Sequence, residues 1–205
     1  MVSVATSIIH GQWLLTGGKG GAAVTGTKRD GIAIDLQALL ASRDARAARR
    51  ASCFAKRRQP TITLTLVMPG PVKDSPLIRA IAEVARHETL AMLARRGWGY
   101  DIHFNTDLPT GPESLYQVDG DAALLKRALV ALEDNHPLGR LWDLDVHDAD
   151  GQALSRSSVG DPPRRCLVCD ADARACGRSR THALDELWSK IETLYDQWLG
   201  QAKPD

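Results

Sequence analysis

The chain has 205 residues, enough for one domain with a substantial hydrophobic core. Its content of 43% hydrophobic and 25% charged residues excludes a disordered protein. Lys and Arg number 26 against 25 acidic residues, so no overall positive charge draws the molecule to nucleic acid or to membranes. No apolar run reaches the roughly 18 residues that a membrane span needs, and we expect a cytoplasmic protein.

The first segment differs in composition from the rest. Residues 1–31 are rich in Gly, Thr and Ala and have no hydrophobic period. Lys19 is followed by Gly20, so the glycine run does not match the phosphate-loop pattern, in which Ser or Thr follows the lysine. We predict a flexible extension over residues 1–31 and a single domain over residues 32–205.

Residues 34–58 have a helical pattern in which Leu36, Leu39 and Leu40 share one face. Ser42 can cap a second helical segment. This region concentrates positive charge, which either forms a solvated helix face or provides a docking surface for an acidic protein. The basic residues are Arg43, Arg46, Arg49, Arg50, Lys56, Arg57 and Arg58.

Alternating polar and β-branched residues predict a strand over residues 61–67. The turn 68–74 follows, and Ser75 and Pro76 begin a helix that ends at Gly97. The helix N-terminus beside Gly70 and Lys73 favours an anion, so these two residues are candidate substrate ligands. An ordinary strand–helix turn is the alternative.

The remaining pattern predicts short strands at 100–104 and 114–118, and then a helix capped by Asp121 with Leu124 among its inward residues. A hairpin over 141–146 and 153–156 follows, closed by Asp148–Gly151, and a helix spans about 183–199. We therefore predict an α+β fold with a mixed or antiparallel sheet and helices on one face. The order indicates a ferredoxin-like βαββαβ core plus a C-terminal helix.

The segment 136–146 carries the most informative pattern. Asp143 and Asp145 are two apart on a strand, so both carboxylates project from one face, while Trp142, Leu144 and Val146 fill the other face. Paired carboxylates suit Mg²⁺, which such residues usually hold together with substrate phosphates. Arg140 can pair with phosphate oxygens. An exposed acidic face on an edge strand is the alternative.

Three cysteines and a histidine cluster in the Cys- and Arg-rich segment 162–182, as Cys166, Cys169, Cys176 and His182. This ligand set can complete a tetrahedral zinc shell, which would be structural because it leaves no open position. Reduced thiols or a redox pair are the alternatives. Several arginines surround the cluster, including Arg165 and Arg178, and either bind a polyphosphate or an acidic partner or belong to a solvated loop.

In combination, several motifs closely resemble the citrate lyase holo-acyl-carrier-protein synthase family over about residues 34–198. They are the segments 68–75, 110–113, 136–146, 154–156 and 165–169 with Cys176, Arg178 and His182, and also residues 42–46. The resemblance implies transfer of the phosphoribosyl-dephospho-CoA group from 2′-(5″-triphosphoribosyl)-3′-dephospho-CoA to a serine of the citrate lyase acyl carrier protein, with release of pyrophosphate.

We assign hypothetical roles within that reaction. Asp143 and Asp145 hold Mg²⁺ against the triphosphate, and Arg140 and Lys73 neutralise the leaving pyrophosphate, with Lys126 as a further candidate. His136 or one of the two aspartates accepts the serine proton.

Two alternatives stay open. One is the same chemistry on another carrier, such as that of malonate decarboxylase. The other is a zinc-bearing nucleic-acid-binding module without enzymatic activity, which the balanced charge and the 5% aromatic content disfavour.

Overall fold

A computed structural model describes residues 28–202, and the predicted extension therefore lies outside the described residues except for its last four positions. Five strands form one open antiparallel sheet in the order β2-β3-β1-β4-β5, which confirms the predicted α+β class. The strands are β1 (Thr61–Leu66), β2 (Tyr100–Leu108), β3 (Gly111–Val118), β4 (Trp142–His147) and β5 (Ala153–Leu154).

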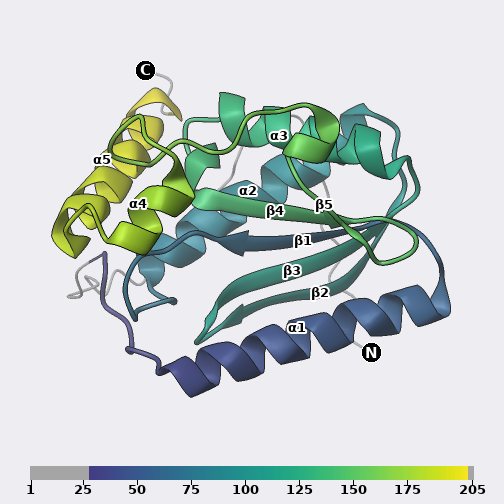
Figure 1. The fold of residues 1–205 in the computed structure, drawn as a ribbon, viewed down its shortest axis with the longest axis horizontal. Helices are drawn as coiled ribbons and strands as arrows, with labels where there is room; N and C mark the ends of the chain where they lie inside the picture. Colours follow the sequence, from purple (N-terminus) through teal and green to yellow (C-terminus); the bar gives the residue numbers. More distant parts are fainter. Residues whose placement is uncertain (1–27, 203–205) are drawn as a thin grey trace, which may run out of the picture.

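Helices α2 (Pro76–Arg95) and α3 (Ala122–Asn135) cover one face of the sheet (Figure 1). The predicted caps are confirmed, since Ser75 accepts a hydrogen bond from the Ile78 amide and Asp121 from the Leu124 amide. Leu124 itself is exposed, contrary to the prediction, because it lies beside the cap rather than under the helix. The core between helices and sheet includes Ile62, Leu64, Ile81, Tyr116, Leu125, Leu129, Trp142 and Leu144.

Helix α1 (Leu36–Lys56) lies on the opposite face of the sheet, so the expectation of helices on one face is wrong for this helix. Arg46 and Arg49 donate hydrogen bonds from α1 to the buried carboxylate of Glu113 on β3. Because these polar contacts hold α1 against the sheet, the apolar pattern of the helix did not indicate which face of the sheet it covers. The helix is capped by Asp35 and is unbroken at Ser42.

The β2–β3 hairpin is longer than predicted, because only Pro109 and Thr110 separate the two strands. Antiparallel pairing continues up to Leu108 opposite Gly111, and Pro112 is tolerated near this hairpin end. Each strand continues through turn-forming residues because it pairs with the other strand. The sequence of either segment alone does not reveal this pairing.

The C-terminal third consists of short elements followed by one long helix. These are the 3₁₀ turns η1 (Gly139–Leu141) and η2 (Ser157–Val159), the unpredicted helix α4 (Ala173–Ser179), and α5 (Leu184–Ala202). Arg29, near the end of the predicted extension, forms an ion pair with Glu192 of α5 through two hydrogen bonds. Among residues 28–202, no helix is both long and apolar enough to cross a membrane.

Candidate active site

A cavity of about 1270 Å³ lies at the end of the sheet where β1 ends and β4 begins. Its walls come from five parts of the chain that are distant in sequence: residues 67–70, Lys126 of α3, residues 140–145, residues 154–157 and the Cys- and Arg-rich segment with the start of α5. Helix α4 lies against this end of the sheet (Figure 1). Because it combines residues from so many elements, this cavity is the strongest candidate for a binding site.

Asp143 and Asp145 both line the cavity. They alternate with the buried Trp142, Leu144 and Val146, as the strand pattern predicts. Burial raises the pKa of the Asp143 carboxyl and the neighbouring Asp145 raises it further, while Arg164 and Lys126 act in the opposite direction. The Asp143 side chain still keeps 41% of its surface exposed, so it remains accessible to a ligand in the cavity.

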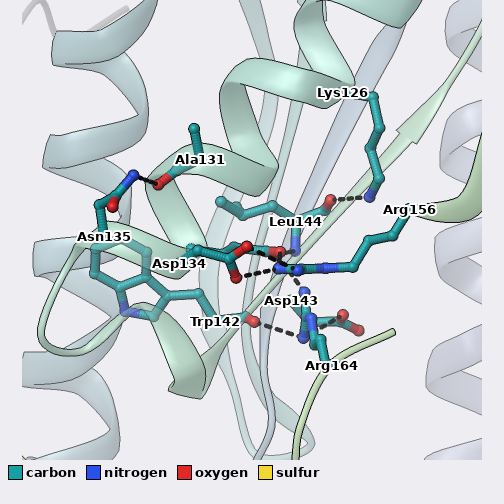
Figure 2. A network of polar contacts seen from close by, with 10 residues as sticks. Lys126, Ala131, Asp134, Asn135, Trp142, Asp143, Leu144, Arg156 and Arg164 are labelled. Atoms are coloured by element: carbon teal, nitrogen blue, oxygen red, sulfur yellow. Dashed lines mark hydrogen bonds and ion pairs between the residues drawn. The ribbon is translucent and has the colours of Figure 1, made fainter. Parts of the chain in front are cut away.

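A buried carboxylate, Glu133 of α3, organises the arginines behind this strand. Only 2% of the Glu133 side chain is exposed, and it accepts hydrogen bonds from the Leu144 amide (2.9 Å), from Arg156 (2.8 Å) and from Arg164. Arg164 also donates to the Trp142 carbonyl at 2.9 Å and lies 3.3 Å from Asp143 (Figure 2). The network therefore fixes the position of β4 relative to α3 and to the segment that contains Arg164.

Two predicted cations reach the cavity beside the aspartates. Lys126 of α3 is buried and donates from Nζ to the Leu144 carbonyl at 3.0 Å (Figure 2). Burial lowers its pKa, and Glu133 and Asp145 oppose that effect. Arg140 lies in η1, where burial and then the like charges of Arg164 and Arg156 lower its pKa. An anion in the cavity would relieve this repulsion.

The loop before α2 contributes only part of what was predicted. Gly70 lines the cavity with φ 75°, and an added Cβ would lie 3.1 Å from the Leu184 side chain, so the position favours glycine. Lys73 is not among the lining residues; its Nζ donates to the Met68 carbonyl and so ties the loop together. Burial and the nearby Arg43 lower the pKa of Lys73.

Three other predicted site residues lie outside this cavity. His136 lines a separate hollow between α2 and α3, where its Nδ1 accepts a hydrogen bond from the Leu138 amide at 3.0 Å. Its ring packs on Trp142, with the centroids 4.4 Å apart. Arg165 is exposed and 3.6 Å from Asp170, and Arg178 also does not line the cavity.

The Cys- and Arg-rich segment brings together the predicted metal ligands. The ligand atoms of Cys166, Cys169, Cys176 and His182 all lie within 4.8 Å of one another, so the cluster can hold a metal ion. His182 Nε2 is 3.3 Å from Cys169 Sγ, and Cys169 Sγ is 3.6 Å from Cys176 Sγ. Three of the four, all but Cys169, also line the cavity, so the cluster shapes its outer wall.

Sequence reasoning did not assign a role to Glu133. A weak signal was present, because Glu133 lies seven residues after Lys126 and shares a helix face with it, among buried leucines. Two charges on a buried stripe indicate partners from elsewhere in the fold. Those partners, Arg156 and Arg164, come from loops that no periodic pattern places.

Paired carboxylates facing a cation-rich cavity on an α+β scaffold are typical of enzymes that act on phosphorylated substrates. The family model for apo-citrate lyase phosphoribosyl-dephospho-CoA transferase (CitX) matches residues 34–198. The chain belongs to this family, as the resemblance predicted.

Curated relatives agree with the family model. The chain is 40% identical, over 162 residues, to the apo-citrate lyase phosphoribosyl-dephospho-CoA transferase of Escherichia coli O7:K1 (strain IAI39 / ExPEC). It is 39% identical to the protein of the same description from Shigella boydii serotype 18 (strain CDC 3083-94 / BS512). Each match covers 79% of this chain and 88% of the relative.

Proposed function

We propose that this chain attaches the phosphoribosyl-dephospho-CoA group to the acyl carrier protein of citrate lyase. The donor is 2′-(5″-triphosphoribosyl)-3′-dephospho-CoA, and the acceptor is a serine hydroxyl of the carrier. The observation that carries the proposal is the placement of Asp143 and Asp145 with Lys126 and Arg140 around one cavity in a chain of this family. Free rather than disulfide-bonded cysteines fit a cytoplasmic reaction.

The chemistry follows from that placement. The serine oxygen forms a bond to the α-phosphorus, the bond to pyrophosphate breaks, and the serine proton passes to one of the two aspartates. His136 is less suited to accept it, because its ring lies in the hollow between α2 and α3. Arg140 and Lys126 stabilise the charge that develops on the phosphoryl oxygens and the leaving pyrophosphate.

Asp143 and Asp145 are the residues that would hold Mg²⁺. Their hard oxygen donors lie on one strand face and line the cavity, which suits this ion. When bound, the ion neutralises charge on the triphosphate. Arg164 Nη1, 3.3 Å from Asp143 Oδ1, already orients that carboxylate.

A zinc ion suits the Cys₃His cluster. The three sulfur donors and one nitrogen donor match its preferred ligands, and four protein ligands leave no open position for catalysis. We therefore assign zinc a structural role in the outer wall of the cavity.

The core of the domain also fits the predicted ferredoxin-like class. Support comes from the chain order β1–α2–β2–β3–α3–β4 and from the antiparallel order β2-β3-β1-β4, in which β3 lies between the strands that α2 connects. Helix α1, β5 and the segment after it are additions to that core.

The activity test uses the Asp143→Asn and Asp145→Asn variants with apo-carrier and donor, and reads the mass increase of the carrier. We expect each variant to lose roughly 100-fold or more in rate, and chelation of divalent cations to stop the wild-type reaction. Asp44→Asn, an exposed acid on α1, is the control and should react normally. Near-normal rates in folded Asp143 and Asp145 variants would contradict the proposed metal role.

The carrier is tested separately. Wild-type enzyme is offered the apo-carriers of citrate lyase and of malonate decarboxylase at equal concentration. We expect modification of the citrate lyase carrier; preferential modification of the other carrier would move the proposal to that substrate.

A further inference from the structure

The arginines that line the cavity fall into two groups by their partners. The side chains of Arg156 and Arg164 are engaged by Glu133. The side chains of Arg140, Arg174 and Arg180 line the same cavity but make no hydrogen bond or ion pair within residues 28–202. Arg156 and Arg164 therefore belong to the framework, that is, the ion-pair network around Glu133. Arg140, Arg174 and Arg180 are available to a ligand.

Helix α4 places two of the free arginines. Asp172 caps it by accepting from the Ala175 amide at 2.8 Å, and Cys176 anchors it in the Cys₃His cluster. The side of the helix with Arg174 and Gly177 faces the cavity, and Arg180 follows at its end. Arg178 lies on the same helix but not on this side.

Arg180 adopts a left-handed backbone conformation with φ 49°, the only positive φ of a non-glycine residue among those the structure describes. Its amide closes the helix on the Cys176 carbonyl. Glycine is the residue that this conformation favours. The backbone conformation therefore does not account for an arginine at position 180. A role for its side chain in the cavity, which it lines, does account for it.

The ligand that suits three free guanidinium groups is a polyphosphate. Guanidinium groups bind phosphate oxygens through paired hydrogen bonds. The cavity volume of about 1270 Å³ also exceeds what a small anion needs. The walls carry fewer acids than cations: three aspartates, of which Asp172 caps α4 and Asp143 lies beside Arg164, against Lys126 and five arginines.

We infer that Arg174 of α4 and Arg180 at its C-cap, together with Arg140, form a polyphosphate-binding wall of the cavity that the aspartate pair also lines, and that Arg156 and Arg164 position the framework instead. Applied to the transfer reaction, the inference rests on the proposed function: the wall binds the phosphates of the donor and does not contact the carrier. The KM for the donor therefore depends on α4, and the KM for the apo-carrier does not.

The test measures binding of inorganic tripolyphosphate by calorimetry to wild type, Arg174→Ala, Arg180→Gly and the control Arg127→Ala. Arg127 is an exposed cation of α3 outside the cavity. Arg180→Gly removes the guanidinium and keeps the left-handed backbone favourable, so that loss of binding is not loss of fold. We expect binding to weaken about 10-fold or more in both α4 variants and to change less than about twofold in the control.

Wild-type-like binding in Arg174→Ala and Arg180→Gly would overturn the inference, as would an equal loss in Arg127→Ala, which would indicate unspecific charge. The transfer assay separates the two proposals. If the α4 variants modify the carrier with an unchanged donor KM, the wall is wrong and the function stands. If tripolyphosphate binding depends on α4 but wild type modifies no carrier, the proposed function is wrong and the wall stands.

Discussion

His136 acts in the structure as a neutral hydrogen-bond acceptor. Its Nδ1 accepts from the Leu138 amide at 3.0 Å, and burial lowers its pKa below the ordinary value of 6.5. A protonated ring cannot accept this bond. The neutral residue therefore stabilises the end of α3 next to η1.

A pH-dependent stability follows for this residue. Because the folded state holds the neutral ring, the unfolded chain binds more protons as the pH falls through 6.5. We expect the free energy of unfolding to decrease between about pH 7.5 and about pH 5.5, and His136→Gln to lose part of that slope. Urea denaturation at several pH values measures it, with the exposed His87→Gln as control. Equal slopes in wild type and His136→Gln would contradict the assignment.

At the scale of elements, the contact between α3, β4 and the loops depends on a buried charge. Glu133 is 2% exposed and binds both Arg156 and Arg164, whereas Asp134 binds Arg156 from a position that is 44% exposed. The two adjacent acids thus share a partner and differ in burial. Variants of Glu133 and Asp134 can therefore be compared directly to measure the effect of burial on the ion pair with Arg156.

We expect Glu133→Gln to lower the free energy of unfolding by about 3 kcal/mol, because it leaves two partly buried guanidinium groups without their shared carboxylate. Asp134→Asn should cost less than about 1 kcal/mol, since exposed ion pairs contribute little. Urea denaturation compares the two. Equal losses would show that Glu133 does not organise the network.

The outer wall of the cavity provides a second prediction at this scale. We expect purified protein to contain about one zinc per chain, and Cys176→Ser to lose it. Metal removal should increase amide exchange over residues 163–182 and leave β1 and β3 protected, because the core does not include the cluster. Metal analysis and hydrogen exchange measure this.

The control for that experiment is Cys53→Ala, because Cys53 is buried on α1, away from the cluster. It should retain the metal. Unchanged exchange over residues 163–182 after metal loss would contradict a structural role.

At the scale of the whole molecule, basic and acidic residues are nearly equal in number, but basic residues predominate in the cavity. The net charge is +1, yet cavity-lining residues include Lys126 and five arginines against three aspartates. Such a cavity attracts an anionic ligand even though the molecule as a whole has little net field.

We therefore expect the KM for the donor to rise several-fold between about 0.05 M and about 0.5 M salt, because the ions screen this attraction. Steady-state assays at saturating carrier measure it. A flat donor KM combined with a rising carrier KM would place the attraction on the carrier surface instead. Within the basic region predicted as a docking surface for an acidic protein, Arg46 and Arg49 of α1 bind Glu113, and Arg57 and Arg58, which follow α1, pair with Asp101 and Asp150.

Local sequence determined the features that neighbouring residues control. The alternation around Asp143 and Asp145 determined which face the carboxylates share, and the spacing of Cys166, Cys169, Cys176 and His182 indicated a ligand cluster. Capping residues and helical stripes located α2, α3 and α5 because these signals act within a few residues.

Only the tertiary structure decided the partners. It placed α1 on the far face of the sheet, His136 outside the cavity, and Glu133 against Arg156 and Arg164. It also showed which of the cavity-lining arginines make no hydrogen bond or ion pair with another described residue, namely Arg140, Arg174 and Arg180. The physical reason is that ion pairs and cavities join segments that are distant in the chain, and no periodicity within one segment specifies what lies opposite it.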